Sequence, residues 1–317
     1  MHNGKRIRFD DDLSRIPSKG GDMTKTYNLL LLPGENHITV SAFSDGRIES
    51  KKESIQINYK GTEKIANCYV LAVGINEYKN TALNLNYAQA DADGFVKMIN
   101  SNGEGLFKNI YIKTIYNAAA TKNHILSVID SMANHINPED VFMFYYAGHG
   151  GVAEGDFYFI PSDNISLYQK TKLEKAAISA KLLQEKLQKV KALKQIVLLD
   201  ACHAGASTEI LAQRGSSSEK ALAQMSRSEG IHVLAAASSE QQATEFGSLG
   251  PGVFTYVLME AINGKADGAP KDGKVTIYEL ISYLDDQVPE ISQKFQGQAQ
   301  YPYTFSLGHD FPITLSK

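Results

Sequence analysis

The sequence predicts an α/β fold in which a mostly parallel sheet is flanked by helices and preceded by a short all-β segment. Two nearly continuous apolar runs, VFMFYYA at 141–147 and IVLLDA at 196–201, are typical of strands covered on both faces. From Ile65 onward such runs alternate with helical patterns, and this order favours a parallel sheet with helices on both sides. Residues 37–43 and 53–59 instead alternate apolar and polar side chains, which indicates half-buried antiparallel strands.

The first 61 residues differ from the rest of the chain. They read as strands at 26–32, 37–43 and 51–61 separated by the turn sequences PGEN and SDGRIES. We interpret residues 1–61 as the end of an immunoglobulin-like β-sandwich whose earlier strands are missing, so we expect the chain to be a fragment of a longer protein. The alternative is a β extension packed onto the main domain, which we place at 65–317.

The main domain is expected to alternate strands and helices. In chain order we predict a strand at 68–76, a helix at 85–101, a strand at 109–117, a helix from the cap Thr121 to His135, strands at 140–147 and 157–161, a helix from the cap Ser179 to about Val190, strands at 195–201 and 231–238, a helix at 251–263 between Pro251 and Gly264, and a helix from the capping box Thr276–Glu279 to about Asp286. The polar, Ser-rich connection at 206–230 is interpreted as functional, disordered or both.

Composition excludes several classes of protein. A net charge of −3 over 317 residues gives no reason to expect nucleic acid or an anionic membrane as a partner. The chain has no apolar run of membrane-spanning length, and its charged start is no secretory signal. Its only cysteines are Cys68 and Cys202. A disulfide between them is possible but disfavoured, because a chain of this size has a core and needs no such crosslink. We therefore expect a reducing, cytoplasmic location.

The candidate chemistry lies after the two apolar runs. His149 follows the first run, and Cys202 follows the second. Because the carboxyl ends of parallel strands lie at one edge of a sheet, we expect these side chains to meet. A cysteine nucleophile needs such a base to take its proton, or an imidazolium to hold its thiolate. The N–H groups of Gly150 and Cys202 could then form an oxyanion hole.

Each of these residues also has a simpler explanation. The GHGG motif could be an ordinary strand-end turn, and Cys202 could be a small buried hydrophobe. His203 is a rival base, disfavoured because adjacent residues on an extended segment point in opposite directions. Cys68 opens a buried strand and is expected to pack there. Zinc would need about four clustered ligands, and the two cysteines stand singly, so no metal site is expected.

The two motifs together carry a family resemblance. YYAGHGG at 145–151 followed by LLDACHAG at 198–205 resembles the caspase–metacaspase superfamily of cysteine peptidases, and among these the metacaspase-like peptidases of bacteria. The resemblance extends over about 65–315 and includes VGINEY, HVLAAAS, VFTYVLMEAI and the final DFPI. It implies a caspase-like sheet with His149 as general base, Cys202 as nucleophile, and the Gly150 and Cys202 amides as oxyanion hole.

The resemblance also implies an acidic specificity pocket and hence cleavage after Arg or Lys. The cysteine motif departs from the Q-A-C-x-G pattern of animal caspases, so their preference for aspartate is not carried over. A pair of carboxylates would suit the fork of an arginine. For Asp91 the alternative is an exposed helix carboxylate or a cap. The residues expected to line or border the pocket are Asp91, Asp200, Ser238, Ser239 and Glu240.

Residues 267–280 have the spacing of half a calcium loop, but the first ligand positions hold Gly268 and Pro270. We interpret this segment as a turn followed by a helix cap. No cofactor is expected, and calcium dependence remains open because some metacaspases bind calcium elsewhere.

The sequence thus predicts a cysteine endopeptidase acting on basic sites in proteins or peptides. The alternative is a catalytically idle caspase fold that serves as an interaction module, and the intact His149 and Cys202 count against it. A regulatory partner could bind through the β segment or the missing N-terminal region. The connection at 206–230 contains three basic residues at which the enzyme could cut itself, Arg214, Lys220 and Arg227. Its alternative role is an uncut loop that covers the site.

Overall fold

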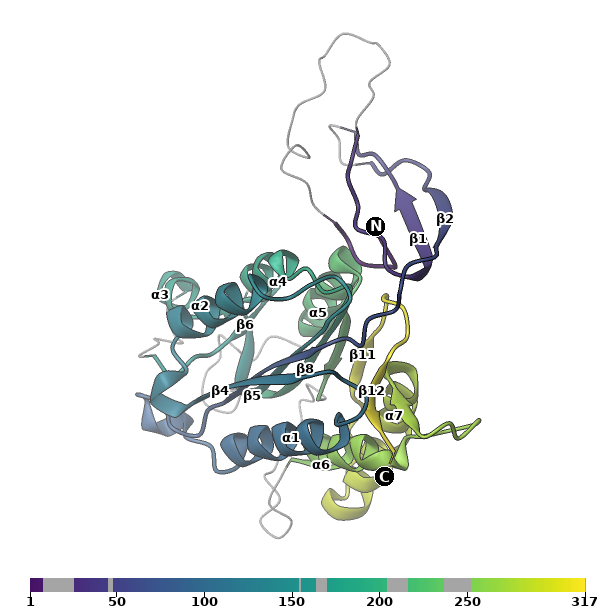
Figure 1. Cartoon of the computed structure of the whole chain (residues 1–317). Helices are drawn as coiled ribbons and strands as arrows, with labels where there is room; N and C mark the ends of the chain where they lie inside the picture. Colours follow the sequence, from purple (N-terminus) through teal and green to yellow (C-terminus); the bar gives the residue numbers. More distant parts are fainter. Residues whose placement is uncertain are drawn as a thin grey trace.

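An eight-stranded sheet with helices on both faces forms the centre of the molecule (Figure 1). The structure is a computed structural model that describes residues 1–7, 26–44, 48–153, 155–163, 170–203, 216–236 and 252–316. Across these ranges, every helix is too short or too polar to cross a membrane.

The main path of the sheet has the order β11-β9-β8-β5-β3-β4. All neighbours along it are parallel except β11, which runs antiparallel to β9. Two short strands continue from the far end of β5, because β6 pairs antiparallel with β5 and β7 pairs with β6. The strands of this sheet are β3 (Cys68–Gly74), β4 (Ile110–Tyr116), β5 (Val141–Ala153), β6 (Asp156–Phe159), β7 (Ile178–Ser179), β8 (Lys194–His203), β9 (His232–Ala235) and β11 (Tyr303–Phe305). The predicted mostly parallel sheet is confirmed.

Helices cover both faces of this sheet (Figure 1). One face carries α2 (Lys122–Ala133), α3 (Lys170–Ala176), α4 (Ala180–Lys189) and α5 (Ser216–Glu229). The other carries α1 (Ala88–Asn102), α6 (Val253–Glu260) and α7 (Ile277–Gln296). The connections include single turns at Thr81–Leu83, Asn117–Ala119 and Ala261–Lys265, and a small antiparallel pair of β10 (Lys274–Thr276) and β12 (Pro312–Leu315).

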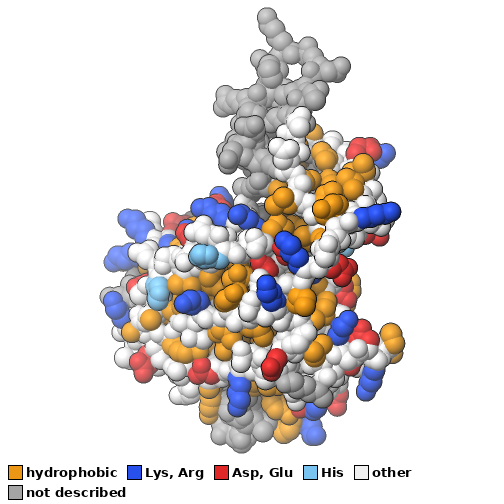
Figure 2. All heavy atoms as spheres, in the orientation of Figure 1, with side chains coloured by type: hydrophobic (Ala, Val, Ile, Leu, Met, Phe, Trp, Pro, Cys, Tyr) orange, Lys and Arg blue, Asp and Glu red, His pale blue; other side chains and the backbone are white. Residues whose placement is uncertain are grey.

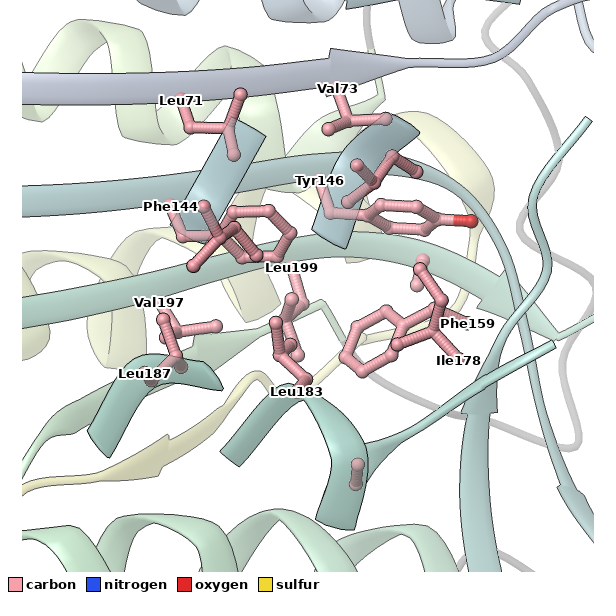
Figure 3. Packing of buried hydrophobic residues seen from close by; sticks show 14 of the residues in the cluster. Leu71, Val73, Phe144, Tyr146, Phe159, Ile178, Leu183, Leu187, Val197 and Leu199 are labelled. Atoms are coloured by element: carbon pink, nitrogen blue, oxygen red, sulfur yellow. The ribbon is translucent and has the colours of Figure 1, made fainter. Parts of the chain in front are cut away.

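The two faces hold two separate apolar clusters, because successive side chains of a strand point to opposite sides. Figure 3 shows the first cluster, in which β3, β5 and β8 supply alternate residues that pack against α4 and β6. The labelled members are Leu71, Val73, Phe144, Tyr146, Phe159, Ile178, Leu183, Leu187, Val197 and Leu199. Burial on both faces explains why these strands read as continuous apolar runs.

Three helix starts follow the predicted caps. The Thr121 hydroxyl accepts from the His124 N–H, and the Ser179 hydroxyl accepts from the Leu182 N–H. Thr276 and Glu279 form the predicted capping box of α7. Each bond satisfies an N–H that has no partner within its own helix, and this fixes where the helix begins.

Four predicted boundaries are wrong. Residues 26–32 form no strand, and the connection at 206–230 contains helix α5. Strand β5 continues six residues beyond the predicted end at 147, because its last residues pair with β6. Helix α7 runs to Gln296 rather than Asp286 and contains Pro289. Burial of Val288 and Ser292 on either side offsets the lost backbone bond and the clash of the proline ring.

The N-terminal segment forms a two-stranded antiparallel sheet of β1 (Gly34–Val40) and β2 (Glu53–Tyr59). It lies to one side of the main sheet, beyond the ends of α4 and α5 (Figure 1). Figure 2 shows hydrophobic side chains on its surface, and Val40 and Ile55 are each 58% exposed. An immunoglobulin-like relationship for residues 1–61 stays a prediction.

The first residues of the chain join this small sheet to the main domain. The Asn3 N–H donates to the His37 carbonyl of β1 at 2.9 Å. Two residues later, the buried Lys5 ammonium donates to the carbonyls of Val190 and Ala192, at the C-terminal end of α4. A helix C-terminus carries partial negative charge, so the lysine is placed where its charge is favourable.

A glycine lies where this anchor meets the main domain. Gly230 ends α5 with φ of +65°, and a Cβ there would stand 1.7 Å from the Gly4 carbonyl oxygen. The contact therefore requires both a left-handed backbone and the absence of a side chain.

We predict that Gly230→Ala lowers the free energy of unfolding more than Gly297→Ala does. Both positions have positive φ, which costs an alanine about 1–2 kcal/mol, but a Cβ at Gly297 meets nothing within 4 Å. The additional clash at Gly230 should cost a further 1 kcal/mol, roughly. Urea unfolding of the two variants measures the difference, and equal losses would contradict the described contact.

Candidate active site

The register of β5 and β8 determines which residues meet at the edge of the sheet. The parallel pairing runs from Val141 opposite Lys194 to Gly150 opposite His203, and it sets His149 opposite Cys202. Neighbouring strands lie about 4.8 Å apart. The backbones at these two positions are therefore adjacent, although 52 residues separate them along the chain.

The histidine lies within a strand rather than in the predicted turn after one. Residues 150–153 continue β5 and pair with β6, with Gly150 opposite Phe159. A Cβ on Gly150 would lie 2.5 Å from Cζ of Phe157, so the close packing of the two strands requires a glycine. The position next to His149 therefore has no side chain.

The ring of His149 is buried and held by a backbone carbonyl. Its Nε2 lies 2.8 Å from the carbonyl oxygen of Leu83. A carbonyl oxygen can only accept, so Nε2 carries the hydrogen of this bond. In the neutral ring the lone pair is then on Nδ1. The ring also packs against Tyr78, with centroids 5.1 Å apart.

Two tyrosines hold the backbone of His149. Its N–H donates to Oη of Tyr78 at 2.9 Å, and Oη of Tyr146 donates to its carbonyl oxygen at 2.9 Å. The Ile160 carbonyl oxygen lies 2.8 Å from the same Oη, so the single hydroxyl proton of Tyr146 is shared between the two carbonyls. Burial raises the pKa of Tyr146 well above its usual range, so the hydroxyl keeps its proton and remains a donor.

Asp200 lies two residues before Cys202, opposite Ala147 of β5. Its carboxyl group is buried, and Oδ2 accepts a hydrogen bond from Oγ1 of Thr255 in α6 at 2.5 Å. The Thr255 hydroxyl in turn lies 2.7 Å from Oη of Tyr145. Burial raises the pKa of the Asp200 carboxyl, and the hydrogen bond from Thr255 opposes that rise.

Asp91 is in the first turn of α1 and is only 5% exposed. It is therefore neither an exposed helix carboxylate nor the cap of α1, which is Tyr87. Helix α1 packs against β3, β5 and α6 on the face of the sheet that also holds the contact of Asp200 with Thr255. The two predicted pocket carboxylates are thus both buried on one side of the sheet.

The other predicted site residues lie elsewhere or outside the described ranges. Ser238, Ser239, Glu240 and Arg214 fall outside the described residues. Lys220 and Arg227 lie in α5, whose helical backbone differs from the expected loop. The rival base His203 is at the last position of β8. Cys68 is buried at the start of β3 within the apolar cluster, and burial raises the pKa of its thiol.

The segment at 267–280 contains the turn and the helix cap that we interpreted, and in addition the short strand β10. The Gly268 N–H donates to Oε1 of Glu279 at 3.0 Å, and Oε2 of the same carboxylate accepts from the Thr276 N–H at 2.9 Å. Both oxygens of Glu279 are therefore engaged by the backbone. Within the described ranges, no three His, Cys, Asp or Glu side chains are grouped so that they could hold a metal ion.

The sequence-based reasoning missed the groups that hold the named residues in place. They are Tyr78 and the Leu83 carbonyl around His149, and Tyr145 and Thr255 beside Asp200. One signal was available, since Thr255 is a polar residue inside the otherwise apolar run VFTYVLM. A buried hydroxyl in such a run needs a partner.

Comparisons with known proteins agree with this fold. The family model described as Caspase domain matches residues 67–311. No curated protein matches the chain. Protein GSU0716 from Geobacter sulfurreducens has a solved structure that is 17% identical, with a TM-score of 0.53, and the match covers 79% of this chain and 100% of that one. The Drosophila initiator caspase Dronc is 11% identical, with a TM-score of 0.49 and coverage of 78% and 81%. At 17% identity, the likeness to the Geobacter sulfurreducens structure concerns the fold alone.

The buried Asp200 carboxyl leads to a prediction about stability. Its pKa is higher in the folded than in the unfolded chain, so stability falls as pH rises from the unfolded pKa through the folded pKa. Asparagine can still accept from Thr255 but carries no charge. We expect Asp200→Asn to be more stable than the wild type at pH 8, with the gain shrinking toward acid pH.

Urea unfolding between pH 4 and pH 8 measures this difference. Asp286→Asn, at an exposed position of α7, is the matched control and should show no comparable gain. If the gain in the free energy of unfolding of Asp200→Asn did not vary with pH, the raised pKa of the buried Asp200 carboxyl would be contradicted.

Proposed function

The chain belongs to the caspase-domain family of cysteine peptidases, and from this we propose that it is an endopeptidase in which Cys202 is the nucleophile and His149 is the base. The observation that carries the proposal is the register of β5 and β8, in which the two residues are paired positions. Side chains at paired positions of parallel strands project to the same face, which suits a nucleophile and its base.

The tautomer of His149 supports its role as the base. With Nε2–H bound to the Leu83 carbonyl, the neutral ring presents its lone pair on Nδ1. In the proposed first step, Nδ1 takes the proton of the Cys202 thiol, and the thiolate attacks the peptide carbonyl carbon. The imidazolium then gives this proton to the leaving amine as the C–N bond breaks. Water hydrolyses the resulting thioester and restores the thiol.

The carbonyl oxygen becomes negative in the tetrahedral intermediate and needs donors. We propose the N–H groups of Gly150 and Cys202 for this role. Support comes from the register, in which Gly150 and Cys202 occupy the same paired segments of β5 and β8.

Basic specificity is the second part of the proposal. Asp200 and Asp91 are 9% and 5% exposed, respectively, on the side of the sheet covered by α1 and α6. Two carboxylates on one side of the sheet create a negative potential that attracts a cation. An arginine or lysine side chain of the substrate would supply that cation, whereas an aspartate side chain would be repelled. Ser238, Ser239 and Glu240 remain predicted neighbours of this pocket.

The catalytic pair can be tested by substitution. We expect Cys202→Ala and His149→Ala each to lower kcat/KM for peptide cleavage by at least about 10³-fold, because nucleophile and base act as one unit. Cys68→Ala is the matched control and should retain activity, since Cys68 lies in the apolar cluster at the start of β3. Fluorogenic peptide assays provide the measurement. Substantial turnover by the Cys202→Ala protein would exclude the cysteine mechanism, and an inactive wild type would favour an interaction module.

Specificity can be tested with a peptide library. Peptides with Arg or Lys before the cleaved bond should be substrates, and peptides with Asp there should not. Asp200→Asn should lower kcat/KM on Arg peptides by about 10–100-fold, as for a charge-assisted contact. The rate at which iodoacetamide alkylates Cys202 should differ much less between Asp200→Asn and the wild type. A library profile dominated by Asp or by large apolar residues would contradict the pocket assignment.

A further inference from the structure

Three buried side chains from three different elements form a chain of hydrogen bonds beside the proposed pocket. Tyr145 comes from β5, Thr255 from α6 and Asp200 from β8. The hydroxyls of Tyr145 and Thr255 lie 2.7 Å apart, and Thr255 Oγ1 lies 2.5 Å from Asp200 Oδ2. Tyr145 and Thr255 are completely buried, so water does not compete for these bonds.

The direction of these hydrogen bonds follows from the number of protons. An ionised carboxylate only accepts, so the single hydroxyl proton of Thr255 is donated to Asp200. Thr255 must then accept from its other neighbour, so Tyr145 donates to Thr255. Donation to Thr255 polarises its hydroxyl and strengthens the bond to the carboxylate. The chain therefore stabilises the charged form of Asp200.

The backbone around Thr255 reinforces this effect. Gly252 is the N-cap of α6, and Thr255 is the third residue of that helix. A Cβ on Gly252 would stand 3.1 Å from Oδ2 of Asp200, so the carboxylate approaches the helix N-terminus closely. That end of a helix favours negative charge. One carboxylate oxygen is thus fixed by a side chain and lies beside a helix end.

We propose that Thr255, supported by Tyr145, is a positioning residue that orients the Asp200 carboxylate for a substrate guanidinium and so favours Arg over Lys. This inference rests on the proposed function. A guanidinium is a planar fork that binds a carboxylate along two fixed directions, whereas an ammonium is a point charge that tolerates rotation. Fixing the carboxylate plane therefore benefits arginine more than lysine.

The pH dependence of cleavage provides a second readout. Besides Asp200, the ionisable groups of β5, α1 and α6 include the buried Tyr145, His149 and Asp91. Asp93 and Lys97 on α1 and Tyr256 and Glu260 on α6 lie at more exposed positions. Removing the Thr255 hydroxyl removes a donor to the ionised carboxylate, so the pKa of Asp200 should rise. Because binding a cation requires the ionised form, the acid limb of kcat/KM on Arg peptides should move to higher pH.

The test compares Thr255→Val, Thr255→Ser and Thr314→Val in the full chain on matched Arg and Lys peptides. Thr255→Val should raise KM for the Arg peptide about tenfold, as for loss of one hydrogen bond to a charged group, and raise KM for the Lys peptide less. Its kcat should change less than twofold, roughly, because the hydroxyl does not touch the reacting atoms. Thr255→Ser keeps the hydroxyl and should restore the KM ratio.

Thr314→Val is the matched control. Thr314 is also completely buried, and its hydroxyl donates to the Ile262 carbonyl, beyond the opposite end of α6. The Thr314→Val variant should leave the ratio of the KM values for the Arg and Lys peptides unchanged. If Thr255→Val does not fold, Tyr145→Phe tests the same chain of bonds, because it removes one hydroxyl and keeps the ring that stacks on Phe95. It should shift the ratio in the same direction.

The outcomes separate this inference from the proposed function. Suppose that the wild type cleaves after Arg and Asp200→Asn does not. Unchanged KM values and an unchanged acid limb in Thr255→Val would then overturn the positioning role alone. An equal loss on Arg and Lys peptides with a lowered kcat would also overturn it, since that pattern marks general damage. If Asp200→Asn keeps full Arg cleavage, the proposed specificity itself fails.

Discussion

The pairing of β5 with β8 is the constraint on which the rest of the molecule depends. Each strand is buried on both faces, so each side chain must match one of two different apolar clusters. A slip of one residue would exchange the two faces and move the Asp200 carboxylate from the α6 side into the opposite cluster. The hydrogen bond from Thr255 therefore penalises the wrong register, because a slipped carboxylate would lose its donor.

Two consecutive tyrosines show how one strand serves two purposes. Tyr145 and Tyr146 point to opposite faces of β5, as neighbouring strand residues do. Tyr145 forms a hydrogen bond with Thr255, the residue that donates to Asp200. Tyr146 donates to the backbone carbonyl of His149. Both rings contribute apolar burial while each hydroxyl finds a polar partner, which is how a large aromatic side chain can be completely buried without an unsatisfied group.

Local chemistry in the sequence was sufficient to predict much of this structure. The caps Thr121 and Ser179 and the capping box at Thr276 were predictable because each needs only residues within one helical turn. The central strands were also predictable, because strands buried on both faces have continuous apolar runs. The general rule for parallel sheets predicted that the two motifs lie at one edge of the sheet, and the register pairs the positions of His149 and Cys202 within β5 and β8.

The missed features depend on partners that are distant in sequence. Helix α5 has the Ser-rich sequence SSSEKALAQMSRSE, in which the apolar stripe is too short to stand out, yet Leu222 is buried against the main cluster. The extension of β5 depends on pairing with β6, so no property of the GHGG residues alone predicts it. Thr255 and Tyr145 acquire their roles only when α6 packs across the sheet.

The strand order also bears on how the two halves of the chain are held together. Strand β8 precedes the segment 204–215 and β9 follows it, yet the two are hydrogen-bonded neighbours. Helix α5 packs beside α4 and β6, which belong to the earlier half. The parts of the chain before and after 204–215 are therefore held together by the pairing of β8 with β9 and by the Asp200–Thr255 hydrogen bond, in addition to the covalent link. A molecule cut within 204–215 would migrate as two pieces in denaturing gels and as a single particle in native chromatography.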